Sequence, residues 1–297
     1  MLVFASPGQG SQSEGFLTPW LEAYPSLQLR LQDYSQAAGR DLVELGTKAD
    51  EATIRDTANA QRLIVGASLA IYRECFEGRA QGVVGHSVGE FAAAAIAGIL
   101  SDFDAMRLVG VRADAMAAAA KQADTSMAAV IGGEESHVLS RLDQAGLFAA
   151  NYNGAGQIVA AGEKSKLSDL IANPPEHSRV IELKVAGAFH TPYMSSAVEA
   201  LRQAAAATSV ADPQIPIWTN RDGTLIRSGA VFVNLLVEQT ANSVRWDQCM
   251  NELQNQEAKV VELPPAGALS GLLKRGAPAV SAVALKSPSD LLKVDEL

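Results

Sequence analysis

The 297-residue sequence predicts a mixed α/β fold in which a small lobe is inserted into a larger α/β body. A short apolar stretch at 82–85 runs directly into a Gly-x-Ser-x-Gly turn and then into an alanine-rich helical pattern that ends at Ala97. Between residues 122 and 185 the patterns follow the order β-α-β-β-α-β, which is typical of the ferredoxin-like motif. We therefore expect a small subdomain at 122–185, and a large subdomain made of 1–121 and 186–297.

The large lobe begins with a short buried strand over Leu2–Ala5, followed by a glycine-rich loop and mostly helical patterns from 19 to 78. Ser101-Asp102-Phe103-Asp104 resembles a capping box that opens a helix to about Lys121. After residue 190, helices alternate with short strands, among them Ile215–Trp218 and Val260–Leu263.

The small lobe is expected to contain four strands and two helices. The strands are Met127–Ile131, Phe148–Asn151, Gln157–Ala161 and Arg179–Val185, and the helices are Glu134–Gln144 and Lys164–Ile171.

Composition excludes several classes of protein. Residues are 48% hydrophobic and 19% charged, as in ordinary globular chains, and no apolar run approaches the ~20 residues of a membrane span. The N-terminus lacks the pattern of a signal peptide, so we expect a cytoplasmic protein in which Cys75 and Cys249 are reduced thiols. No metal-ligand spacing is present, and a net charge of -9 argues against general nucleic-acid binding.

The pentad from Gly85 to Gly89 has the context of a nucleophile elbow, because a strand precedes it and a helix follows it. Ser87 would then project at a helix N-terminus, where backbone N–H groups can stabilise negative charge on an acyl oxygen. The strand before the pentad and the helix after it favour a covalent serine enzyme, because a Gly-x-Ser-x-Gly pattern without this context often occurs by chance.

A serine nucleophile needs a base, and only four histidines are available. His86 is adjacent to the serine and poorly placed to turn back onto it, His137 lies in a polar helix turn, and His177 lies in a loop-like segment. His190 ends an apolar run where the chain returns to the large lobe, so it is the expected base. No acid after the elbow sits at an obvious strand end, so a carbonyl could orient the imidazole in a Ser-His dyad.

Arg112 falls on the apolar stripe of the helix that opens at Ser101. A guanidinium there needs an anionic partner. That partner could be one of the protein's own carboxylates, or the side chain could reach the surface; alternatively, Arg112 could pair with a carboxylate on the substrate.

Seven motifs stand in order along the chain: Pro7-Gly8-Gln9-Gly10-Ser11-Gln12, Gly85–Glu90, Arg112 with Met116, Asn151-Tyr152-Asn153, Gly156–Val159, Gly187–His190, and Gln239 with Asn242 and Trp246. Taken together, they resemble the malonyl-CoA:acyl carrier protein transacylases, and the overall sequence looks most like the actinobacterial members. One departure lies in Leu263-Pro264-Pro265-Ala266-Gly267, where the family usually has Gly-Pro-Gly, so local loop contacts there are in doubt.

The resemblance implies an α/β-hydrolase-like large subdomain, a ferredoxin-like insert and a ping-pong acyl transfer. Ser87 would attack malonyl-CoA with His190 as base, and the backbone carbonyl of Gln239 would orient the imidazole. The Val88 N–H and a donor near Gln9 would hold the oxyanion.

On the same grounds, Arg112 would bind the malonyl carboxylate, with Met116, Phe189 and Asn153 in the acyl pocket. Phe189 before the base argues for malonyl rather than methylmalonyl groups. The partners implied are malonyl-CoA and an acyl carrier protein, with no resident cofactor and a monomeric chain; Lys274 and Arg275 could dock the carrier, or could be ordinary solvated residues.

The expected function is therefore transfer of malonyl to the phosphopantetheine thiol of an acyl carrier protein for fatty acid synthesis. The alternatives are the same transfer for a polyketide synthase or a malonate decarboxylase, a serine thioesterase or other hydrolase, and a non-catalytic module that docks carrier proteins.

Overall fold

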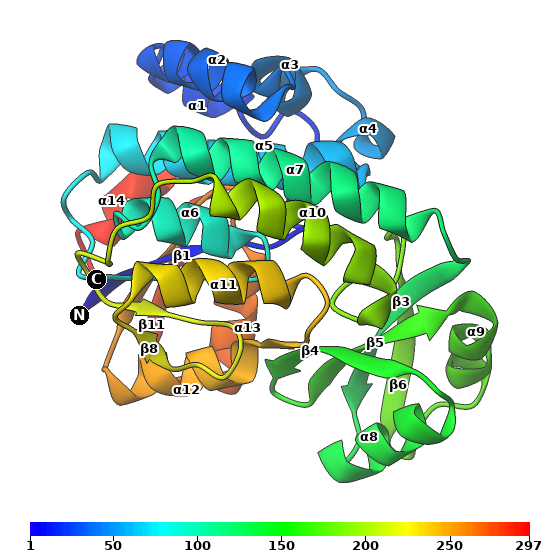
Figure 1. Ribbon diagram of the computed structural model, residues 1–297. Helices are drawn as coiled ribbons and strands as arrows, with labels where there is room; N and C mark the ends of the chain where they lie inside the picture. The colour runs from blue at the N-terminus through cyan, green and yellow to red at the C-terminus, as the bar shows by residue number, and fades with distance from the viewer.

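The computed structural model describes residues 1–297 and contains two sheets in separate lobes (Figure 1). The larger sheet has the strand order β11-β10-β1-β2-β7-β8, in which only β8 is antiparallel to its neighbour. Its strands are β1 (Leu2–Ser6), β2 (Gly82–Gly85), β7 (Ile217–Trp218), β8 (Leu225–Ile226), β10 (Lys259–Glu262) and β11 (Ser281–Ala284).

Helices cover both faces of this sheet (Figure 1). The helices of the large lobe are α1 (Thr18–Ala23), α2 (Ser26–Ala38), α3 (Leu42–Thr47), α4 (Glu51–Arg55), α5 (Thr57–Cys75), α6 (Gly89–Ile96), α7 (Asp102–Ala120), α10 (Ser195–Ala206), α11 (Gly229–Gln239), α12 (Trp246–Asn255), α13 (Ala268–Gly276) and α14 (Leu291–Val294), with 3-10 turns at Pro192–Met194 and Pro288–Asp290.

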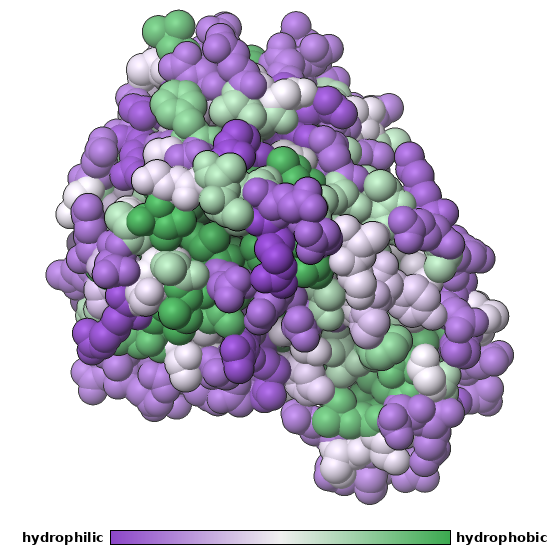
Figure 2. Space-filling view, in the orientation of Figure 1, coloured by the Kyte–Doolittle hydropathy of each residue, from purple (hydrophilic) through white to green (hydrophobic).

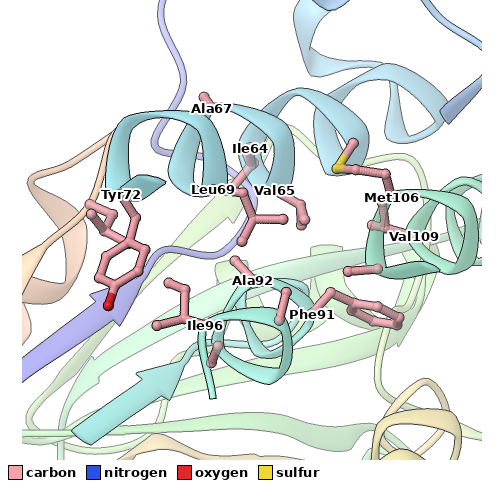
Figure 3. Packing of buried hydrophobic residues seen from close by; sticks show 14 of the residues in the cluster. Ile64, Val65, Ala67, Leu69, Tyr72, Phe91, Ala92, Ile96, Met106 and Val109 are labelled. Atoms are coloured by element: carbon pink, nitrogen blue, oxygen red, sulfur yellow. The ribbon is translucent and has the colours of Figure 1, made fainter. Parts of the chain in front are cut away.

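The alternation of side chains along β1 explains why both faces are buried. Phe4 points into the core formed with α5, α6 and α7, whereas Val3 and Ala5 point into the core formed with α12 and α13. Figure 3 shows the first of these cores, where Leu69 of α5 faces Ala92 of α6. The close packing holds α6, and with it the end of β2, at a fixed height above the sheet.

The smaller sheet has the order β6-β3-β5-β4-β9, and its first four strands have the arrangement of a ferredoxin-like motif. Its elements are β3 (Thr125–Gly132), α8 (Glu135–Gln144), β4 (Phe148–Gly154), β5 (Gln157–Glu163), α9 (Lys164–Ala172), β6 (Ser178–Leu183) and β9 (Val244–Arg245). All six elements expected between residues 122 and 185 are confirmed. Strand β9 comes from much later in the chain and pairs in parallel with β4, so it ties the small lobe to the large one.

The predicted fold class is confirmed, whereas the expected lobe limits at 122 and 185 stay predictions. Helix α7 begins after Ser101, whose Oγ accepts the Asp104 N–H at 3.0 Å. The other half of the expected capping box is not formed, because the Asp104 carboxylate instead accepts hydrogen bonds from the Ser101 hydroxyl and from Arg107.

The two faces of the small sheet have different neighbours. One face packs on α8 and α9, and the other packs on the C-terminal half of α7 and on residues 188–197. Figure 2 shows the small lobe projecting from the larger body, with a notch between them and hydrophilic residues over most of this face. No helix is long and apolar enough to cross a bilayer.

Candidate active site

The turn between β2 and α6 is the expected elbow, with Ser87 at its apex in the left-handed region (φ 52°). The two flanking glycines are required by close backbone contacts. A Cβ on Gly85 would lie 2.2 Å from the Glu90 nitrogen, and a Cβ on Gly89 would lie 2.1 Å from the Ser6 carbonyl oxygen. The two glycines of the pentad therefore allow a close approach between backbone segments that any side chain would prevent.

Asn220, which the sequence analysis did not identify, fixes the shape of the elbow. Its Oδ1 accepts the Ser87 N–H at 2.6 Å, and its Nδ2 donates to the Gly85 carbonyl at 2.6 Å. Its own N–H donates to Glu90 at 2.6 Å. Asn220 is fully buried, so these bonds form in a region without competing water. Nothing near Asn220 in the sequence marks it, because it follows a two-residue strand, β7, in a different part of the chain.

Ser87 and His190 form the expected pair. The Ser87 Oγ and His190 Nε2 lie 2.7 Å apart, and His190 Nδ1 lies 2.8 Å from the backbone carbonyl of Gln239. A carbonyl only accepts, so Nδ1 carries the proton and Nε2 is free to accept from the serine. Burial, reinforced by the charge of Arg112, lowers the pKa of His190 to about 3, so the imidazole is a neutral base at ordinary pH.

The other three histidines, which the sequence analysis excluded as the base, do not contact the Ser87 hydroxyl. His86 Nε2 is 3.1 Å from Asn153 Oδ1, and its ring contacts that of Trp246 edge-on, so these two residues fix the imidazole beside the elbow at the wall of the cavity. His137 is on the surface beside Glu134, and His177 is in an exposed loop.

Arg112 lies inside the molecule with 1% of its surface exposed, and none of its protein partners is a carboxylate. Nη1 donates to Gln61 Oε1 at 2.6 Å, and Nη2 donates to Gln239 Oε1 at 3.1 Å. Nη2 also lies 3.4 Å from the Ser87 Oγ, and Nε has no partner. An ion pair with one of the protein's own carboxylates, the first alternative at the sequence level, is therefore wrong.

The sequence analysis assigned no role to two further residues near Arg112, Gln61 and Glu90. Gln61 of α5 supplies one of the two amide acceptors of the guanidinium and also donates to the sulfur of Met116. Glu90 of α6 is 1% exposed and is held by Asn220 and Gln239. Glutamine and glutamate are common on helices. Their residue type alone therefore does not indicate a role in the site, which becomes visible only when the fold shows that they point inward.

A cavity of about 190 Å³ connects these groups between the two lobes. Its lining brings together Gln9, Val88, Met116, Asn153 and Phe189 with Ser87, Arg112 and His190, so every candidate except Gln239 lines it. Gln239 lies behind His190 and faces a separate hollow.

The backbone N–H groups of Gln9 and Val88 have no hydrogen-bond partner in the protein. Both residues line the cavity that contains the serine, and Val88 is the N-cap residue of α6, where the helix dipole is positive. These two unused donors are suited to an oxygen that gains negative charge.

Comparison with known proteins identifies the family. The Acyl transferase domain family matches residues 3–286. The malonyl CoA-acyl carrier protein transacylase of Mycobacterium tuberculosis strain H37Rv is 46% identical over 303 residues, covering 100% of this chain and 99% of that protein. This chain belongs to the malonyl CoA-acyl carrier protein transacylase family.

Solved structures of the transacylase family share the fold. The crystal structure of MCAT from Mycobacterium tuberculosis has a TM-score of 0.94 at 46% identity and covers 99% of both chains. A malonyl-transacylase in complex with its type II PKS acyl-carrier protein has a TM-score of 0.91 at 27% identity, again over 99% of both chains.

The segment 263–267, where the sequence departs from the family pattern, forms the loop between β10 and α13. Here the Pro264 carbonyl accepts the hydroxyl of buried Ser68 at 2.8 Å, and Gly267 has a positive φ of 132°. Gly267 lines a second cavity next to the first, so the loop contributes to the approach to the serine rather than to its immediate surroundings.

The depressed pKa of His190 predicts the pH dependence of Ser87 reactivity. A neutral base is needed, so lowering its pKa moves the acid limb of the rate profile to lower pH. We expect labelling of Ser87 by an uncharged serine-directed reagent to change less than about twofold between about pH 5 and pH 7, where a histidine of ordinary pKa would lose roughly 25-fold. A limb centred near pH 6.5 would show that burial does not lower the pKa of His190.

The contacts of Asn220 predict that an isosteric acid is not tolerated. Asn220→Asp removes the donor to the Gly85 carbonyl and adds a second buried carboxyl group near Glu90, so the free energy of unfolding should fall by about 2–4 kcal/mol. Chemical denaturation measures the change. Asn255→Asp at the exposed end of α12 is the control, and should stay within about 0.5 kcal/mol of the parent protein. Equal stabilities for the two variants would show that Asn220 does not hold the elbow.

Proposed function

We propose that this protein transfers the malonyl group of malonyl-CoA to the phosphopantetheine thiol of an acyl carrier protein, through a malonyl-Ser87 intermediate, for fatty acid synthesis. The observation that carries the proposal is Arg112. Its buried guanidinium has only amide and hydroxyl partners, and it lies 3.4 Å from the nucleophilic oxygen. A buried cation without a carboxylate partner is costly, and the carboxylate of a malonyl group on Ser87 would supply one.

The first half-reaction uses the dyad. The Ser87 oxygen attacks the thioester carbonyl carbon while His190 Nε2 takes the hydroxyl proton. The imidazolium formed is stabilised by the Gln239 carbonyl on Nδ1. When the tetrahedral intermediate collapses, the C–S bond breaks and the CoA sulfur leaves with the proton from His190.

The second half-reaction is the reverse with a different thiol. The carrier's phosphopantetheine sulfur attacks the malonyl-serine ester, gives its proton to His190 and releases Ser87, which regains the proton. Because the two substrates use the same site in turn, the expected kinetics are ping-pong.

The unpaired N–H groups of Val88 and Gln9 are assigned to the oxyanion that forms in both steps. Met116 and Phe189 limit the width of the acyl pocket beside Arg112, and Asn153 orients His86 at its edge. The side chain of Phe189 favours the unbranched malonyl group, because it lies in the cavity wall where a methyl branch would need space.

A second cavity of about 340 Å³ lies next to the first and shares Gln9, His86 and Asn153 with it. Arg275 of α13 is part of its wall, whereas Lys274 is not. We assign this cavity to the pantetheine arm of either thiol. Arg275 is the better candidate of the pair for contact with an acidic carrier protein.

The partner assignment is supported by the relatives. The complex of a malonyl-transacylase with its type II PKS acyl-carrier protein has the same fold at 27% identity. The 46% identity with the mycobacterial transacylase over its full length favours the fatty acid role over the polyketide one. The chain's own side chains complete the site, so we propose a monomeric enzyme that needs no resident cofactor; the proposed role in fatty acid synthesis supports a cytoplasmic location. A single 31.2 kDa species in light scattering would support the monomer, and a dimer would overturn it.

Mass spectrometry of the intact protein after exposure to malonyl-CoA tests the central claim. The added mass should be one malonyl group on Ser87, and it should disappear when a phosphopantetheinylated carrier protein is added. Ser87→Ala should acquire no adduct. Rapid release of free malonate without a carrier would instead support a thioesterase, and no adduct with either malonyl-CoA or a serine-directed reagent would support a docking module.

Substitution of Arg112 tests the carboxylate role. Arg112→Ala should slow acylation of Ser87 by malonyl-CoA by about 100-fold or more, because the carboxylate would be buried unpaired, while acylation by acetyl-CoA should change less than about tenfold. Single-turnover acylation followed by mass spectrometry measures both rates. Arg107→Ala, on the same helix but half-exposed and paired with Asp104, is the matched control and should change neither rate. Equal losses for the two acyl groups in Arg112→Ala would refute the role.

A further inference from the structure

Glu90 is a buried acid that the proposed chemistry does not use. It is the second residue of α6, three positions after the nucleophile, and only 1% of its surface is exposed. Its Oε1 accepts the Asn220 N–H at 2.6 Å, and its Oε2 accepts from Gln239 Nε2. It makes no direct contact with Arg112 or His190, so its influence on the site must pass through a neighbour.

That neighbour is the side chain of Gln239, which lies between Glu90 and Arg112. An amide has one donor end and one acceptor end. Gln239 Nε2 donates to Glu90 and to the Ser87 carbonyl, the latter at 3.1 Å, and two acceptors fix this end as the donor. The other end, Oε1, is therefore turned towards Arg112 Nη2 at 3.1 Å.

The guanidinium is thus held by two amide oxygens, one from Gln239 and one from Gln61. Glu90 reaches Arg112 only through the Gln239 amide. When Glu90 is ionised, its negative charge therefore stabilises the buried cation without occupying the N–H groups of Arg112. A direct ion pair would compete with an incoming carboxylate for the same donors.

We propose that Glu90 is a positioning residue: through the amide of Gln239, its carboxylate fixes the orientation in which Arg112 receives a carboxylate-bearing acyl group. This inference rests on the proposed function of the site. The competing explanation is that Glu90 only stabilises the elbow through Asn220. The two explanations differ because loss of a purely structural contact lowers the rates for all acyl groups together.

Glu90→Gln is the direct test. The introduced amide can donate to Gln239 Oε1, so the Gln239 amide can turn over and present its Nε2 to Arg112, which cannot accept it. At about pH 9 we expect the ratio of malonyl to acetyl single-turnover acylation rates to fall by about tenfold or more, as for loss of one charge-assisted hydrogen bond. Labelling of Ser87 by an uncharged serine-directed reagent should change less than about threefold.

Glu262→Gln is the matched control. Glu262 is also fully buried, and its two oxygens accept the Leu269 and Ser270 N–H groups at the start of α13, away from Arg112. This variant should lose stability while keeping the malonyl-to-acetyl ratio of the parent protein.

A second variant keeps the test independent of Glu90. Gln239→Leu removes the amide and leaves the backbone carbonyl that accepts from His190, so it should lower the same ratio. If Glu90→Gln does not fold, a Gln239→Leu variant that keeps the ratio of the parent protein overturns the relay.

The pH profile gives a further readout. Burial raises the pKa of Glu90 to about 8, against the opposing effects of the Asn220 N–H, the Gln239 amide and the Arg112 charge. The titratable groups that face it are Arg112 on α7 and Cys249 on α12. Burial lowers the pKa of Arg112 only to about 10 and raises that of Cys249, so both groups stay mainly protonated up to about pH 9. The malonyl-to-acetyl ratio of the parent protein should therefore rise from about pH 7 to about pH 9 as Glu90 loses its proton, and that of Glu90→Gln should stay flat.

The outcomes separate this inference from the proposed function. If the parent protein is not acylated by malonyl-CoA, the proposed function fails. If the parent protein is acylated with preference for malonyl, but folded Glu90→Gln and Gln239→Leu keep that preference, the positioning role is overturned and the proposed function stands.

Discussion

The closest backbone contacts in the site are at the elbow, and the rest of the site depends on them. The Gly85 Cα faces the backbone of Glu90, and the Gly89 Cα faces the Ser6 carbonyl, at distances that leave no room for a Cβ. This crossing keeps Ser87 at a positive φ with its side chain raised towards the small lobe. Strained residues persist only where their surroundings determine them, and here the surroundings are α6, β1 and Asn220.

The elbow also determines the electrostatics of the site. Helix α6 starts there, so it carries both the free Val88 N–H and the buried Glu90. Helix α7 packs on α6 and brings Arg112 over the ring of Phe91, at 5.9 Å from its centroid. The Gln239 amide thus lies between the Arg112 guanidinium and the Glu90 carboxyl group, which do not contact each other directly. Burial, reinforced by the cation, lowers the pKa of the neighbouring base His190 and keeps it neutral.

Much of this could be predicted from sequence, because the signals were local. The strand, the glycines and the helix around Ser87 are contiguous, and the six elements of the small lobe show clear periodicity. Arg112 stood out because it breaks an apolar stripe. Asn220 and Gln61 gave no signal, because their roles depend on contacts across more than 50 residues and their residue types are ordinary for their positions. The strand β9 was missed because two residues are too few to show a period.

Gln239 shows why the base and the carboxylate site cannot vary independently. It is the last residue of α11, where a backbone carbonyl has no partner within the helix, and its carbonyl accepts from both the Asn242 N–H and His190 Nδ1. The side chain of the same residue reaches between Glu90 and Arg112. A shift of the end of α11 would therefore move the imidazole and the guanidinium together. The geometry of proton transfer and the recognition of a charged acyl group are set by one residue, and the packing of α11 against α6 and α10 holds that residue in place.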